Sequence, residues 1–186
     1  MEVRLSPHSV YINTPPPYLE EYRIPCINFM RVITREAFLR LESFFLAVNI
    51  FDRVLAKGLD GLNGTRKHAL ACLLVAAKYV ERNPFSNIPA YIHLAQSKGV
   101  SVGNDDFKAC ERKVLAMVHF DLGWPTPLAF LKRYLKVEDH GIQTRIVATY
   151  LLEIMVSSHS FLRHLPSVQA ATALHFSRCI EGKHQW

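Results

Sequence analysis

The sequence predicts an all-helical protein. Hydrophobic residues make up 49% of its 186 residues and charged residues 20%, a balance typical of a globular protein with a large core and not of a disordered chain. Glycine is scarce, with 8 residues, which suits long helices better than a chain of hairpins. Apolar residues recur at steps of three and four, and no strand-like alternation of useful length accompanies them.

Prolines and glycines divide the chain into three parts. Residues 1–25 include three consecutive prolines and are expected to form a largely irregular tail. Residues 26–125 are expected to form a five-helix bundle, and residues 126–186 to begin a second, partial helical unit. The expected helices span about 27–33, 34–57, 66–80, 88–96 and 104–118, then 128–135, 142–161 and 166–180.

Two local patterns support these helices. Residues 69–77 are apolar without interruption, and a helix that lacks a polar face belongs at the centre of a bundle. Thr34 is a plausible N-cap between the first two helices. Thr126 can cap a later helix whose first position is Pro127, where a missing backbone N–H does no harm.

The residues offer no sign of catalysis. Metal-binding, nucleophilic and nucleotide-binding motifs are absent, and the four cysteines are too far apart in sequence for a C-x-x-C site, so we expect no enzyme activity, metal, cofactor or small-molecule substrate. No apolar run approaches the ~20 residues of a membrane span, so no membrane association is expected. The net charge of +6 is spread along the chain; it serves solubility or attraction to an acidic partner surface, and nucleic-acid binding is not expected.

Three charged residues interrupt apolar helix faces. Asp52 needs a buried partner, because an unpaired buried carboxylate is costly, and an arginine earlier in the chain would serve. Lys78 and Glu111 have two interpretations. They can be ordinary helix-end charges with their stems along apolar surface, or they can be part of a binding site.

A family resemblance favours the second interpretation. Residues 46–53 (Leu-Ala-Val-Asn-Ile-Phe-Asp-Arg) are similar to the L-A-V-N-x-x-D-R segment of the cyclin box, and residues 76–81 resemble its A-S-K-[YF]-E-E segment. Further matches lie, in the family's order, at residues 30–33, 111–115, 120–127 and 165–170. The chain therefore resembles a cyclin of the A/B type, with a complete first cyclin box and a truncated second one.

The resemblance implies a regulatory subunit that binds and activates a cyclin-dependent serine/threonine protein kinase in cell-cycle control. Lys78 and Glu111 would grip the regulatory helix of the kinase. The surrounding contact surface would comprise Tyr79, Glu81, Leu115, Phe120 and Leu122. Nuclear and cytoplasmic residence is a family inference, since no targeting signal is visible.

The resemblance also assigns residues of the first helix. Arg31 would form the buried ion pair with Asp52. Met30 and Ile33 would remain from a substrate-docking patch whose tryptophan is replaced by Ala37, so we expect weak binding of R-x-L substrates. The stretch between Met30 and Leu46 is shorter than in A/B-type cyclins, which indicates an abridged first helix.

Two alternatives stay open. One is a cyclin-box adaptor in transcription, similar to the general transcription factor of the IIB type. The other is a degenerate cyclin that folds without activating a kinase. A second unit that ends after about three helices is expected to expose apolar faces between Ile142 and Ile180.

Overall fold

The computed structural model describes residues 19–58, 62–82, 88–137 and 141–183, and every regular element among them is helical. The all-helical prediction is therefore confirmed for this part of the chain. The described residues form two compact units, which divide between Trp124 and Pro125. The first unit contains α2 (Leu19–Glu36), α3 (Leu41–Leu55), α4 (Leu62–Val80), α5 (Ile88–Ser97) and α6 (Asn104–Met117).

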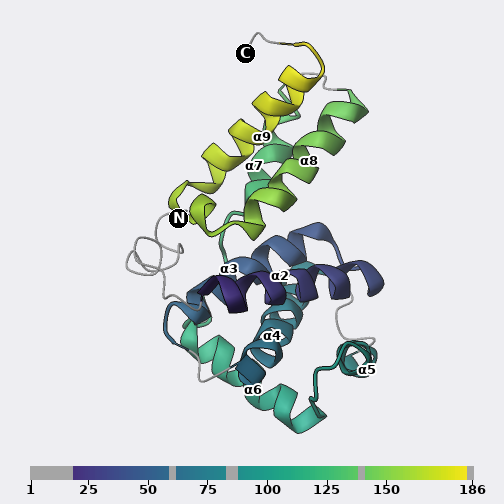
Figure 1. Ribbon diagram of the computed structural model, residues 1–186, viewed down its shortest axis with the longest axis vertical. Coiled ribbons are helices and arrows are strands. Elements are labelled where there is room, and N and C mark those ends of the chain that lie inside the picture. Colours follow the sequence, from purple (N-terminus) through teal and green to yellow (C-terminus); the bar gives the residue numbers. More distant parts are fainter. Residues whose placement is uncertain (1–18, 59–61, 83–87, 138–140, 184–186) are drawn as a thin grey trace. The chain divides into compact units, whose positions relative to one another are not determined.

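Helix α4 is the centre of the first unit, as its apolar sequence predicted. Residues 69–77 are all buried, and the helix packs against α2, α3 and α6 (Figure 1). Its large side chains include Leu70, Leu73 and Leu74. Removing one such buried leucine side chain typically costs about 2–5 kcal/mol, so this helix carries much of the stability of the unit.

Helix α2 begins earlier than the sequence predicted. It starts at Leu19 and continues through Pro25, so residues 19–25 are helical rather than part of an irregular tail; residues 1–18 lie outside the described part. The proline removes one backbone hydrogen bond near the start of the helix. Burial of Cys26, Ile27 and Met30 against the bundle outweighs that loss.

The boundary between α2 and α3 also differs from the expectation. Thr34 lies inside α2 and its hydroxyl donates to the carbonyl O of Met30 at 2.7 Å, so it is not an N-cap. Helix α2 ends instead in a Schellman motif. Leu39 N–H donates to Thr34 O at 2.9 Å, and Phe38 adopts a left-handed conformation with φ of 54°. For a residue with a side chain this conformation costs about 1–2 kcal/mol.

The second unit contains α7 (Pro127–Tyr134), α8 (Ile142–Ser157), the 3-10 helix η1 (His159–Arg163) and α9 (Pro166–Ile180). Thr126 caps α7 as predicted, because its side chain accepts a hydrogen bond from Ala129 N–H at 3.2 Å. Helices α7, α8 and α9 pack on one another. The opposite face of α8 carries exposed apolar residues one turn apart: Ile142, Ile146, Tyr150 and Ile154. The expected apolar exposure is therefore present.

Candidate functional site

Lys78 and Glu111 form an ion pair at the surface of the first unit. Lys78 is in the last turn of α4 and Glu111 is in the middle of α6, and their packing brings Lys78 Nζ to Glu111 Oε1. Their side chains keep 24% and 16% of their accessible surface. Lys78 Nζ also lies 6.0 Å from the centre of the Phe107 ring, which is favourable for a cation. Both charges are thus held in place while they remain accessible from outside.

Exposed and half-buried apolar side chains lie close to the Lys78–Glu111 pair. Tyr79 follows Lys78 directly and is 59% exposed, and Leu115 lies one turn beyond Glu111 on α6. Phe120, just after α6, is 71% exposed, and Leu122 is half-buried. The Tyr79 hydroxyl approaches Gly123, which follows Leu122 in sequence. The structure therefore brings the end of α4, α6 and the segment after α6 together, and their role in binding a kinase stays a prediction.

The turn that carries Phe120 has a strained backbone. His119 and Phe120 both have positive φ, at 55° and 56°, and Phe120 N–H donates to Leu115 O at 2.9 Å in a second Schellman motif. Bulky residues rarely adopt this conformation, and such strain persists only where surrounding contacts hold it.

Arg53 near the end of α3 and Lys57 just after it supply those contacts. Arg53 donates to the carbonyl O of Asp121 at 2.8 Å and to that of Val118 at 3.1 Å. Burial lowers the pKa of the Arg53 guanidinium and nearby Asp121 opposes that effect. Lys57 Nζ donates to Met117 O and lies 3.2 Å from His119 Nε2. Although Arg53 lies in one of the segments that carry the family resemblance, its sequence position does not reveal that it reaches this distant turn.

Glu81 has a structural role that the sequence did not predict. Its Oε1 accepts hydrogen bonds from Arg40 N–H at 2.8 Å and from the Ser43 hydroxyl at 2.6 Å. Arg40 is the N-cap residue of α3 and its own side chain makes no cap. The Glu81 carboxylate instead accepts from the N–H of the N-cap residue, as the acidic residue of a capping box does, and faces the positive end of the helix dipole. Its contact with a kinase stays a prediction.

The predicted pair between Arg31 and Asp52 is wrong, because Arg23 is the partner of Asp52. Arg23 Nε lies 2.7 Å from Asp52 Oδ1 and Arg23 Nη2 lies 2.9 Å from Oδ2, and both side chains are 1% exposed. Arg31 instead donates to the side-chain O of Asn28 at 2.7 Å and lies over the Phe44 ring. Arg23 shares a helix face with Ile27, so its burial was readable once α2 was known to include Pro25.

Because Arg23 rather than Arg31 meets Asp52, the first helix aligns with the family pattern eight residues earlier in this chain. With Arg23 in place of Arg31, the argument for an abridged first helix no longer applies, and α2 has 18 residues. Met30 and Ile33 are fully buried in the core and form no docking patch, so that prediction is also wrong. The same shift puts Phe29, which is 8% exposed, where Ala37 had been placed. An aromatic residue therefore occupies the position of the family's tryptophan. The prediction of weak binding to R-x-L substrates rested on an alanine at that position, so it no longer follows.

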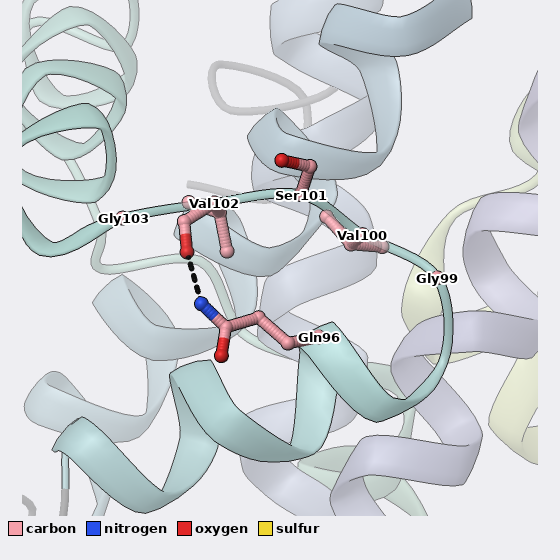
Figure 2. Close-up of a pocket in the computed structure, with 6 residues that line it drawn as sticks. All are labelled: Gln96, Gly99, Val100, Ser101, Val102 and Gly103. Carbon is pink, nitrogen blue, oxygen red and sulfur yellow. Dashed lines mark hydrogen bonds between the residues drawn. The ribbon is translucent and has the colours of Figure 1, made fainter.

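Other kinds of site find little support in the described residues. They contain no group of three His, Cys, Asp or Glu side chains placed to hold a metal ion. None of their helices combines the length and apolar character required to cross a bilayer. Figure 2 shows an open depression of about 490 Å³ formed by Gln96 and residues 99–103, where the Gln96 side-chain amide donates to Val102 O at 2.7 Å. Its lining includes the Ser101 hydroxyl but no acid or base that could activate it.

Comparison with protein families agrees with these sequence motifs. The cyclin N-terminal domain family matches residues 1–123, and the cyclin C-terminal domain family matches residues 125–186. The chain belongs to the cyclin family. Relatives include G2/mitotic-specific cyclin-2 of Saccharomyces cerevisiae, 36% identical over 86% of this chain, and G2/mitotic-specific cyclin-3 of the same yeast, 31% identical over 100% of this chain. The resemblance to A/B-type cyclins is thereby confirmed.

Solved structures support the cyclin fold independently. A viral cyclin from herpesvirus saimiri matches with a TM-score of 0.77 and 17% identity, covering 97% of this cyclin and 82% of the viral chain. A chain of the yeast RNA polymerase II CTD kinase complex CTDK-1 matches with a TM-score of 0.75 and 12% identity, covering 90% of this cyclin and 57% of that chain. This cyclin spans 32% of the length of yeast cyclin-2 and 43% of yeast cyclin-3.

Proposed function

We propose that this cyclin binds a cyclin-dependent protein kinase and activates it during cell division. The observation that carries the proposal is the Lys78–Glu111 pair, which stands at the surface beside Tyr79 and close to the strained Phe120 turn. Relatives named as G2/mitotic-specific cyclins give the cell-cycle context. The family pattern and the exposure of these residues together support the proposal.

The pair is suited to exchange partners on binding. In the isolated chain Lys78 and Glu111 satisfy each other, so neither charge is left uncompensated. A kinase can offer backbone carbonyls to the Lys78 ammonium and N–H groups to the Glu111 carboxylate, since a lysine only donates and a carboxylate only accepts. Tyr79 and Phe120 can bury apolar surface around these polar contacts, as aromatic anchors do at the centre of stable interfaces.

Activation would follow from preferential binding to one kinase conformation. A surface that contacts the regulatory helix of the kinase in its inward position, with the activation segment ordered, shifts the kinase toward its active state. This role needs no catalytic group in the cyclin itself. We infer nuclear and cytoplasmic residence from the family alone.

The test is co-purification of the full chain with a panel of cyclin-dependent kinases, followed by a phosphorylation assay on the recovered complex. We expect a stable complex with raised activity. The Lys78→Ala plus Glu111→Ala variant should lose it while keeping the helical content of the wild type.

A matched control uses a second ion pair between the same two helices. Lys67 Nζ of α4 lies 3.7 Å from Asp106 Oδ2 of α6, three turns before Lys78 on α4. The Lys67→Ala plus Asp106→Ala variant should bind as the wild type does. Equal binding by both double variants would refute the grip, and binding of no kinase would favour the degenerate cyclin or the transcription adaptor. Steeply salt-dependent DNA binding would identify the adaptor.

A further inference from the structure

Phe38 is an exposed aromatic residue in an unusual position. It is 94% exposed at the turn between α2 and α3, the highest value among the large apolar side chains of the described residues. It also occupies the left-handed position of the Schellman motif that ends α2, with φ of 54°. Neither burial nor backbone preference explains a phenylalanine there, because the ring lies in solvent and the conformation favours glycine.

The other helix ends of this kind show what the position normally requires. Helices α5 and α9 end in the same motif and place Gly99 and Gly182 at the left-handed position, with φ of 81° and 76°. Helix α6 departs from this pattern at His119, and the next residue is the exposed Phe120 of the proposed kinase surface. Among the helix ends of α2, α5, α6 and α9, which share this motif, the two without glycine are thus the two that present an exposed phenylalanine. Backbone strain of this sort gathers at functional sites.

Phe38 is also continuous with that surface. Two residues later, Arg40 N–H donates to Glu81 Oε1 at 2.8 Å and the Arg40 guanidinium lies 3.4 Å from Val80 O. The segment after α2 therefore lies against the end of α4, where Lys78 and Tyr79 are found. Two residues of chain separate their Cα atoms by at most about 7 Å, so Phe38 borders the same region.

We propose that Phe38 is an additional anchor of the kinase-docking surface, and that it inserts into an apolar pocket of the kinase beyond the Lys78–Glu111 grip. The inference rests on the proposed function, because the occupant is the same kinase. It extends the contact across the α2–α3 turn. The partner chemistry is an apolar pocket able to take one aromatic ring, since Phe38 carries no polar group.

The test compares two substitutions with opposite effects on strain. Phe38→Gly removes the ring and relieves the left-handed backbone, so it should unfold at a higher temperature than the wild type while binding a cyclin-dependent kinase about tenfold more weakly. Phe38→Tyr keeps both the ring and the strain, so it should bind as the wild type does. Phe176→Ala, which removes a half-exposed ring from α9, is the control and should leave affinity unchanged.

The outcomes separate the anchor from the grip. Wild-type affinity in Phe38→Gly would overturn the anchor alone, provided that Lys78→Ala plus Glu111→Ala still abolishes binding. Weaker binding together with a lower unfolding temperature would also overturn it, because Phe38 would then act through the fold. Failure of the wild-type chain to bind any kinase of the panel would overturn both proposals.

Discussion

Arg23 and Asp52 form a buried two-point ion pair that ties α2 to α3 across 29 residues of sequence. The planar guanidinium matches both carboxylate oxygens, so each charge that is removed from water keeps directed hydrogen bonds. Because loss of one partner leaves the other buried and uncompensated, Arg23→Ala should lower the free energy of unfolding by about 3–5 kcal/mol. Urea denaturation measures this change.

Arg31 supplies the control for that pair. It lies over Phe44 at the edge of the core and donates to the side-chain O of Asn28, so Arg31→Ala should cost about 1 kcal/mol or less. A larger loss from Arg31→Ala than from Arg23→Ala would contradict the pairing described above. The double replacement Arg23→Met plus Asp52→Leu should recover much of the stability, because apolar residues of similar size remove the uncompensated charge.

Arg53 is predicted to be a positioning residue for the docking surface. Its two hydrogen bonds hold the carbonyls of Val118 and Asp121 on either side of Phe120. Arg53→Ala should therefore weaken kinase binding about tenfold and speed amide exchange at residues 117–121. Arg112→Ala is the matched control, since its guanidinium donates to Lys108 O within α6. Unchanged exchange and affinity in Arg53→Ala would exclude the positioning role.

Glu81 is predicted to stabilise the start of α3. Glu81→Ala removes the acceptor of Arg40 N–H and the Ser43 hydroxyl, so unfolding should require about 1–2 kcal/mol less free energy. Glu36→Ala, which breaks only the exposed pair with Lys98, should change stability by less than about 1 kcal/mol. Equal thermal stabilities of the two variants would show that Glu81 is no cap.

The raised pKa values of two buried thiols predict that the protein loses stability at alkaline pH. Burial raises the pKa of Cys26 from its ordinary value of 9.0 to about 12, opposed by the charge of Arg66, and burial followed by the charge of Asp52 raises the pKa of Cys72 well above 9.0. Between pH 9 and 12 the unfolded chain therefore releases protons that the folded chain keeps. The unfolded state then binds fewer protons, so the stability conferred by the neutral thiols is present below pH 9 and falls as pH rises.

The fall should approach about 1.4 kcal/mol per pH unit for each thiol that stays protonated only in the fold. Denaturation at pH 8, 9, 10 and 11 measures the slope. The Cys26→Ala variant should show a smaller slope than the wild type over this range, even if its stability at pH 8 is lower. An equal slope in both proteins would assign the alkaline loss to other groups.

Burial and helix periodicity show where sequence reasoning succeeded and where it failed. The uninterrupted apolar run at residues 69–77 identified α4 as central, because a helix without a polar face can only be stable when it is surrounded. Thr126 followed by Pro127 identified the start of α7, because the capping interaction is local. Pro25 led the same reasoning to start the first helix too late. The cost of a proline in a helix can be read from the local sequence, but the burial that offsets this cost depends on how other helices pack against it.

The candidate site divides in the same way. Lys78 and Glu111 were identified from sequence because charged residues on apolar helix faces stand out, and family spacing supported them. Arg53 and Glu81 act on residues 65 to 68 and 38 to 41 positions away in the chain, so no local pattern reveals their targets.

The sequence by itself determined the helical class, the central helix, the family and the two charged residues Lys78 and Glu111 of the proposed docking surface. Only the tertiary structure decided that Arg23 rather than Arg31 meets Asp52, that Met30 and Ile33 are core residues, and that Phe38 lies in solvent. The physical reason is that periodicity and capping depend on neighbours within one or two turns. The partner of a buried charge and the exposure of a ring depend on how separate helices pack together.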